Sequence, residues 1–125
     1  MEKDRLPKKV MVIDDEPAVV KQFSLLLSEN DYEPIPVTSA LEAMSLLTSE
    51  QPDLVILDIK MPRLDGFEFL RSLRQSPRTK NLPVIIVSAF SDGELRLQAK
   101  EMGVVRYLVK PYQPDELISL VKSLV

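Results

Sequence analysis

The 125-residue chain contains no cysteine and no histidine, and only three glycines. Without cysteine it has no disulfide and no thiolate metal site. Without histidine it has no imidazole metal ligand, no imidazole general base and no Ser-His-Asp triad. The few glycines leave little room for long flexible loops. Any chemistry must therefore use carboxylates, hydroxyls and lysine.

Long apolar runs are also absent, since none is much longer than four or five residues. A membrane-spanning helix needs about 20 such residues. The charged opening, from Met1 to Arg5, lacks the apolar stretch of a secretory signal. We therefore expect no membrane association and a cytoplasmic location.

Positive charge is not concentrated in any part of the chain. The 16 basic and 19 acidic residues are mixed and give a net charge of −3, while hydrophobic residues make up 45% of the chain. This composition is typical of one soluble globular domain. Binding to nucleic acid requires a basic stripe, so we predict no direct contact with nucleic acid.

Five short apolar runs alternate with longer segments of helical periodicity, which predicts a (βα)₅ chain. The predicted strands are residues 10–13, 34–37, 54–57, 84–87 and 107–109. The first, third and fourth are apolar on both faces, as in parallel strands covered by helices. Pro34 and Pro36 assign the second strand to an edge of the sheet. The pattern predicts an α/β fold with a doubly wound parallel sheet.

Start and stop signals frame the helices between these strands. Pro17 and Pro114 suit the first position of a helix. Capping boxes, a serine followed three residues later by glutamate, are predicted at Ser39 and Ser91, and Asp65-Gly66 precedes the third helix. Gly103 is placed to end the fourth helix.

Polar side chains follow four of the predicted strands at the point where each strand ends. They are Asp14 and Asp15 after the first, Asp58 after the third, Ser88 after the fourth and Lys110 after the fifth. Each alone could be a helix cap, a turn residue or a solvated group. Because the carboxyl ends of parallel strands meet at one sheet edge, we expect all of them to share one site.

Three carboxylates in one small pocket repel each other unless they are protonated or hold a cation. Oxygen ligands without histidine or cysteine select a hard ion, Mg²⁺ first and Mn²⁺ as the alternative. Lys110 and Ser88 could surround the oxygens of a phosphoryl group. Asp58, the lone carboxylate of the central strand, is then the predicted nucleophile and would form an acyl phosphate.

Four segments together resemble the receiver domain of response regulators, including the single-domain chemotaxis regulator. They are Ile13-Asp14-Asp15-Glu16, residues 57–66 from Leu57 to Gly66, Val87-Ser88-Ala89, and residues 107–112 from Tyr107 to Tyr112. The resemblance implies a flavodoxin-like three-layer sandwich with strand order 2-1-3-4-5. It covers residues 8–125 as the receiver domain, after a lead-in of residues 1–7.

The resemblance also implies roles for individual residues. Asp58 would accept phosphate from a sensor histidine kinase or a His phosphotransfer protein, and Lys110 would pair with the phosphoryl group. Asp15, Asp58 and the backbone carbonyl of Lys60 would bind Mg²⁺ directly, and Asp14 largely through water. Ser88 and Tyr107 would form the switch, and the Lys110-Pro111 peptide bond would be cis, with Pro111 fixing the approach of the lysine.

Phosphorylation would then change the face formed by the fourth helix, the fifth strand and the fifth helix, and this face could also form a homodimer. Beyond phosphotransfer to Asp58 and later hydrolysis of that phosphate, no conventional enzyme activity is expected. Lys60 and Phe90, each two residues past a site residue, resemble the family's tuners of this hydrolysis rate.

Two other readings of the sequence stay open. One is a phosphorylation-independent protein-interaction module on the same fold. The other is a phosphohydrolase, which Lys60 disfavours because an acidic residue is wanted two positions after the nucleophile. The whole protein could be a stand-alone regulator or the amino-terminal module of a longer one. The sequence does not indicate which effector it acts on.

Overall fold

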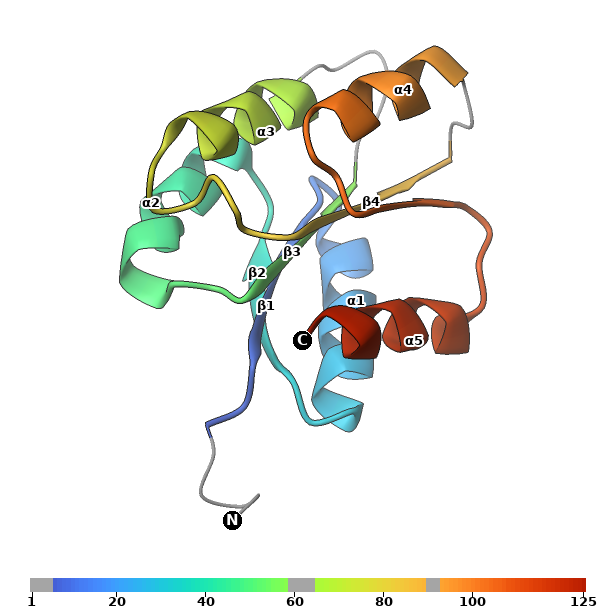
Figure 1. Ribbon diagram of the computed structural model, residues 1–125. Helices are drawn as coiled ribbons and strands as arrows, with labels where there is room; N and C mark the ends of the chain where they lie inside the picture. The colour runs from blue at the N-terminus through green and yellow to red at the C-terminus, as the bar shows by residue number, and fades with distance from the viewer. Residues whose placement is uncertain (1–5, 59–64, 90–92) are drawn as a thin grey trace.

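Five parallel strands form one sheet in the order β2-β1-β3-β4-β5 in the computed structural model of this chain (Figure 1). The structure describes residues 6–58, 65–89 and 93–125. The strands are β1 Lys9–Ile13, β2 Glu33–Val37, β3 Leu54–Asp58, β4 Val84–Ser88 and β5 Arg106–Val109. The predicted fold class and strand order are confirmed, and β2 with its two prolines is an edge strand.

Five helices connect the strands and cover both faces of the sheet (Figure 1). They are α1 Pro17–Glu29, α2 Ala40–Glu50, α3 Asp65–Gln75, α4 Gly93–Glu101 and α5 Pro114–Leu124. The third helix already includes Asp65 and Gly66, one difference from the prediction. No helix in the described part of the chain has the length and apolarity needed to cross a membrane.

Two hydrophobic cores lie on opposite faces of the sheet, because successive strand residues point to opposite sides. On one face, Met11 and Ile13 of β1 pack with Leu70 of α3 and with side chains of α2 and α4. On the other face, Val10 and Val12 pack with side chains of α1 and α5. The two cores make the molecule a three-layer sandwich. Their packing keeps the inner strands aligned with one another.

The helix starts follow the predicted chemistry where they are described. Pro17 and Pro114 begin α1 and α5. The Ser39 hydroxyl accepts a hydrogen bond from the Glu42 backbone N–H at 3.1 Å, which satisfies one N–H at the start of α2. Gly103, with φ of 79°, follows α4. The predicted capping box at Ser91, like the predictions for Lys60 and Phe90, lies outside the described residues.

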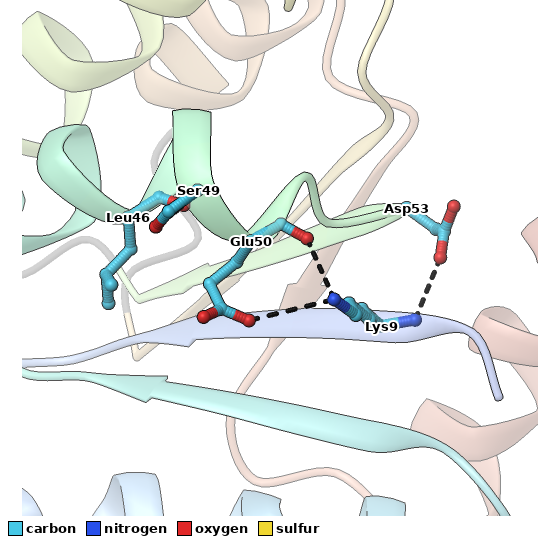
Figure 2. Close-up of polar contacts among 5 residues, drawn as sticks. All are labelled: Lys9, Leu46, Ser49, Glu50 and Asp53. Atoms are coloured by element: carbon cyan, nitrogen blue, oxygen red, sulfur yellow. Dashed lines mark hydrogen bonds and ion pairs between the residues drawn. The ribbon is translucent and has the colours of Figure 1, made fainter. Parts of the chain in front are cut away.

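Two hydrogen bonds join Lys9 and Asp53 at the end of the sheet opposite the strands' carboxyl ends. The Lys9 backbone N–H donates to Asp53 Oδ2 at 2.8 Å, and the Asp53 N–H donates to the Lys9 carbonyl at 2.8 Å. Figure 2 shows the Lys9 ammonium reaching the Glu50 carbonyl at 3.2 Å and Glu50 Oε1 at 3.7 Å. These contacts fix the α2–β3 connection against β1, so that β3 starts in register.

The Arg74 guanidinium links three segments at the same end of the molecule. Its Nη1 donates to the carbonyls of Lys80 at 3.2 Å and Leu82 at 2.9 Å. Nε donates to the Met102 carbonyl at 2.8 Å, and Nη2 to the Gly103 carbonyl at 3.1 Å. Burial lowers the pKa of Arg74. One side chain thus joins the end of α3, the α3–β4 connection and the turn after α4.

Candidate functional site

Asp58 lies at the carboxyl end of β3, a central strand. It is the last residue of the strand, because its Cα still pairs with Val87 of β4. Its side chain is only 2% exposed. Ser88 likewise closes β4, pairs with Val109 and is fully buried. Each of these strands extends one residue beyond its apolar run, so both side chains are held by the sheet and not by a loop.

Asp14 directly follows β1 and is held by hydrogen bonds to the backbone groups of Val37 and Glu16. Its N–H donates to the Val37 carbonyl at 3.1 Å, and its Oδ1 accepts from the Glu16 N–H at 2.9 Å. The residue is 2% exposed. Since β1 pairs with β3, the Asp14 and Asp58 carboxyl groups become neighbours in the interior.

Lys110 supplies the positive charge beside this pair. Its Nζ lies 2.5 Å from Asp58 Oδ2. Its backbone N–H donates to the Ser88 carbonyl at 2.8 Å, and the Lys110–Pro111 peptide bond is cis. The Lys110 side chain is 29% exposed, whereas that of Asp58 is almost fully enclosed. The lysine therefore reaches inward from the surface to a buried carboxylate.

Lys110 nevertheless compensates the negative charge of the Asp58 carboxylate only in part. Burial, followed by the neighbouring Asp14 carboxylate, raises the pKa of Asp58 to about 7, although Lys110 acts in the opposite direction. Its second oxygen, Oδ1, is buried and has no hydrogen-bond partner among the residues described. A buried carboxylate with one unsatisfied oxygen favours either a proton or a cation.

A cavity of about 140 Å³ opens next to the two carboxylates. Asp14, Asp15 and Asp58 contribute to its wall, together with Ser39 at the start of α2 and Phe69 of α3. Asp15 is exposed, whereas Asp14 is buried. The structure thus brings the three predicted carboxylates to one cavity, with Asp15 at its accessible side.

The carboxylates in this cavity suit a hard divalent cation. They are oxygen donors only, and the unsatisfied Asp58 Oδ1 offers a buried ligand atom. Within residues 6–58, 65–89 and 93–125, no three acidic side chains already converge as a complete set of metal ligands. Mg²⁺ commonly keeps several waters and uses only one or two protein carboxylates. The cavity therefore fits an open magnesium site.

Tyr107 lies on β5, away from the carboxylate cavity. It is half-buried and packs on the core shared by α2, α3 and α4. The Arg96 guanidinium of α4 lies over its ring, with Cζ at 5.3 Å from the centroid. Sequence reasoning found Tyr107 but missed Arg96, because a cation over a ring depends on how α4 packs.

Tyr112 is a second residue that the sequence analysis did not assign. Its ring stacks on Phe23 of α1, with centroids 6.2 Å apart and planes at 8°. Burial, and then the negative charges of Asp58 and Asp14, raise the pKa of Tyr112 to about 12. The sequence feature that could have identified Tyr112 is its position as an aromatic residue directly after Lys110-Pro111. The stacking anchors the segment that carries Lys110 against α1.

Comparison with known proteins gives a consistent picture. Residues 10–122 match the family model described as the response regulator receiver domain. Response regulator Rre1 from Synechocystis sp. is 36% identical over 119 residues, which are 94% of this chain and 52% of that protein. The chain spans about half the length of the curated relatives it matches.

Solved structures share the fold over nearly the whole chain. The chemotaxis protein CheY4 of Vibrio cholerae has a TM-score of 0.87 and 26% identity, and the match covers 95% of this chain and 99% of that one. The signal receiver domain of a signal transduction histidine kinase from Syntrophus aciditrophicus has a TM-score of 0.83 and 30% identity, with 94% and 89% covered.

Proposed function

Because this chain belongs to the response-regulator receiver family, we propose that Asp58 is its phosphoacceptor in a cytoplasmic His-Asp phosphorelay. The phosphate donor is a sensor histidine kinase or a His phosphotransfer protein. The observation that carries this proposal is the buried Asp58 at the end of a central strand, with the Lys110 Nζ 2.5 Å from its Oδ2. A purely structural ion pair would not leave the other carboxylate oxygen buried without a hydrogen-bond partner in the described part of the chain.

In the transfer step, an Asp58 carboxylate oxygen attacks the phosphorus of phosphohistidine. The O–P bond forms as the P–N bond breaks, and the departing imidazole nitrogen takes up a proton. Asp58 must be ionised to attack, and Lys110 favours this form because it lowers the pKa that burial raises. Once the acyl phosphate exists, the Lys110 ammonium can interact with its oxygens.

Asp15, Asp58 and the Lys60 carbonyl are the proposed direct ligands for Mg²⁺, and Asp14 acts largely through water. When bound, the cation supplies positive charge that offsets the carboxylates and the incoming phosphoryl oxygens. Asp14 contributes by its buried position beside Asp58, where its charge makes a cation favourable. Mn²⁺ has similar oxygen preferences and is the alternative ion.

Ser88 and Tyr107 are the proposed switch residues. Ser88 is buried at the end of β4, and its carbonyl holds the Lys110 backbone at 2.8 Å. Tyr107 is on β5, beneath Arg96 of α4. In the proposed switch, the Ser88 hydroxyl turns toward the phosphate and Tyr107 moves inward, which changes the face formed by α4, β5 and α5.

The test is phosphorylation by a small acyl phosphate or phosphoramidate donor, followed by intact-protein mass spectrometry. We expect the mass increase of one phosphate, dependent on Mg²⁺ and lost on treatment with base. Asp58→Asn should abolish it. Asp115→Asn is the matched control, because Asp115 is an exposed residue in the first turn of α5. The same mass increase on Asp58→Asn would overturn the assignment of Asp58.

A negative result with an intact fold would favour the phosphorylation-independent interaction module. In that case a partner would bind the wild type and the Asp58→Asn variant equally. Measuring circular dichroism on the same samples separates a misfolded variant from one that is folded but inert.

A further inference from the structure

Tyr112 attaches the connection between β5 and α5 to the rest of the molecule. Of residues 111–116, all are exposed except Tyr112. Its ring packs against the core that α1 and α5 form on one face of the sheet. A cavity of about 840 Å³ opens beside this connection, and Ala89, Lys110 and Tyr112 are part of its wall. Among the described residues, Tyr112 is therefore the main side-chain attachment of the segment that follows Lys110.

The attachment is a stack of two aromatic rings. The rings of Tyr112 and Phe23 have planes at 8° and centroids 6.2 Å apart, which is the geometry of an offset aromatic pair. Phe23 is 4% exposed and lies in the middle of α1, so the ring that supports Tyr112 is itself fixed in the core. The contact is made by the Tyr112 ring and not by its hydroxyl, so a phenylalanine could make it equally well.

Lys110 has to reach past a whole strand to meet Asp58. Asp58 ends β3 and Lys110 follows β5, and β4 lies between these two strands. Because adjacent strands are about 4.8 Å apart, the lysine side chain bridges about two such spacings. Its Nζ nevertheless lies 2.5 Å from Asp58 Oδ2, on a side chain that is 29% exposed. A long side chain that bridges this gap keeps its position only if its backbone is held firmly.

Two anchors hold the backbone at Lys110. The first is the hydrogen bond that the Lys110 N–H donates to the Ser88 carbonyl at 2.8 Å, which joins it to the end of β4. The second is the stack of Tyr112 on Phe23 two residues later, which joins the same segment to α1. The first anchor fixes the lysine residue itself. The second keeps the connection that follows from moving away from the carboxylates.

We propose that Tyr112 is a positioning residue for phosphotransfer, because its stack on Phe23 keeps the Lys110 ammonium at the Asp58 carboxylate. In this role Tyr112 touches none of the reacting atoms and acts through Lys110. The inference rests on the proposed function, in which Asp58 accepts the phosphate and Lys110 interacts with its oxygens. Loss of the stack should therefore remove part of the rate that the lysine supplies, and loss of the lysine should remove all of it.

The first experiment measures the rate of phosphorylation by a small acyl phosphate donor with Mg²⁺, followed by mass spectrometry. Tyr112→Leu removes the ring and keeps an apolar side chain. It should lower the rate about two- to tenfold, the range that the strength of one aromatic pair allows. Tyr112→Phe keeps the ring and should restore the rate. Phe23→Leu should cause a similar loss, and combining it with Tyr112→Leu should cause no further loss, because both variants break the same contact.

Two comparisons separate a role through Lys110 from a general loss of stability. Lys110→Ala should lower the rate more than Tyr112→Leu does, and Tyr112→Leu should have no further effect in that background, since no ammonium is left to position. Tyr32→Leu is the matched control, because Tyr32 is another half-buried tyrosine that packs against the same core. It should leave the rate unchanged even where thermal unfolding shows an equal loss of stability.

The second experiment does not involve phosphate. Because the Lys110 N–H is bonded to the Ser88 carbonyl, its hydrogen exchange, followed by NMR, reports how firmly this backbone is held. Exchange at Lys110 should be faster in Tyr112→Leu than in the wild type, and Tyr112→Phe should exchange like the wild type. The Val105 N–H, which donates to the Val84 carbonyl at 2.9 Å just before β5, is the internal control and should be unaffected.

The two readouts keep the failure of this inference apart from the failure of the proposed function. A wild type that takes up no phosphate overturns the proposed function, and with it the role of Tyr112 in phosphotransfer. A wild type that is phosphorylated no faster than Tyr112→Leu overturns the positioning role alone. An equal loss of rate in Tyr32→Leu, a further loss in the Lys110→Ala background, or unchanged exchange at Lys110 would also overturn it.

Discussion

Replacing Asp58 with asparagine is expected to stabilise the fold in magnesium-free buffer at neutral and alkaline pH. Asparagine keeps the shape of the protonated side chain and removes the buried charge. The pKa of Asp58 rises from 3.8 to about 7, mainly through burial and the neighbouring Asp14. A difference of about 3 units corresponds to about 4 kcal/mol between the two protonation states. We take this value as the upper limit, because Lys110 loses its partner in the variant.

The sign of the pH dependence follows from the protons bound by each state. Between the unfolded pKa and about 7, the folded chain holds a proton on Asp58 that the unfolded chain has released. The contribution of Asp58 to the free energy of unfolding of the wild type therefore falls as pH rises through this window, and it is constant above the window. The advantage of Asp58→Asn should be close to zero below the unfolded pKa and reach its maximum above the folded one.

Urea unfolding with a chelator present, followed by circular dichroism, measures the difference. At about pH 8 the midpoint of the variant should exceed that of the wild type by an amount equal to about 2–4 kcal/mol, and at about pH 4 the two should nearly coincide. Added Mg²⁺ should stabilise the wild type and leave the variant almost unchanged. A variant that is less stable at the higher pH, or an advantage that does not change with pH, would refute the reasoning.

Three further substitutions test the contacts that hold the scaffold, each read by thermal or urea unfolding. Arg74→Met removes the guanidinium that binds the carbonyls of Leu82, Met102 and Gly103, and should cost about 2–3 kcal/mol, whereas Arg71→Met on the exposed surface should cost little. Ser39→Ala removes the cap of α2 and should cost about 1 kcal/mol, and the exposed helical Ser45→Ala should have no such effect. Gly103→Ala should cost about 1–2 kcal/mol, because φ is 79° and a Cβ would lie 3.3 Å from Arg74 Nε. Equal stability of any of these variants and the wild type would contradict the assigned contact.

Much of the fold followed from local patterns. Continuous apolarity in residues 10–13, 54–57 and 84–87 predicts central parallel strands, and these are the three inner strands of the sheet. Pro34 and Pro36 cannot donate ladder hydrogen bonds, so they predict an edge strand, which β2 is. The proline and serine signals at Pro17, Ser39 and Pro114 predict helix starts because each acts through its own backbone or its neighbours within one turn.

The candidate site was predictable in its members but not in its energetics. Asp14, Asp15, Asp58, Ser88 and Lys110 follow or end strands, and a parallel sheet brings such ends to one edge. The sequence cannot show that the Asp58 side chain is 2% exposed or that its Oδ1 finds no hydrogen-bond partner among the described residues. Both properties depend on how helices and loops distant in sequence enclose the side chain, and they decide that its pKa rises to about 7.

The sequence by itself determined the order of strands and helices and the residue types at the strand ends, because these depend on short-range periodicity and on the topology of parallel sheets. Only the tertiary structure decided which side chains from separate elements meet. The Arg96 guanidinium over Tyr107, the Tyr112 ring on Phe23 and the three segments joined by Arg74 are contacts of this kind. Their geometry depends on the packing of α1, α3 and α4 against the sheet, and no local pattern in the chain encodes it.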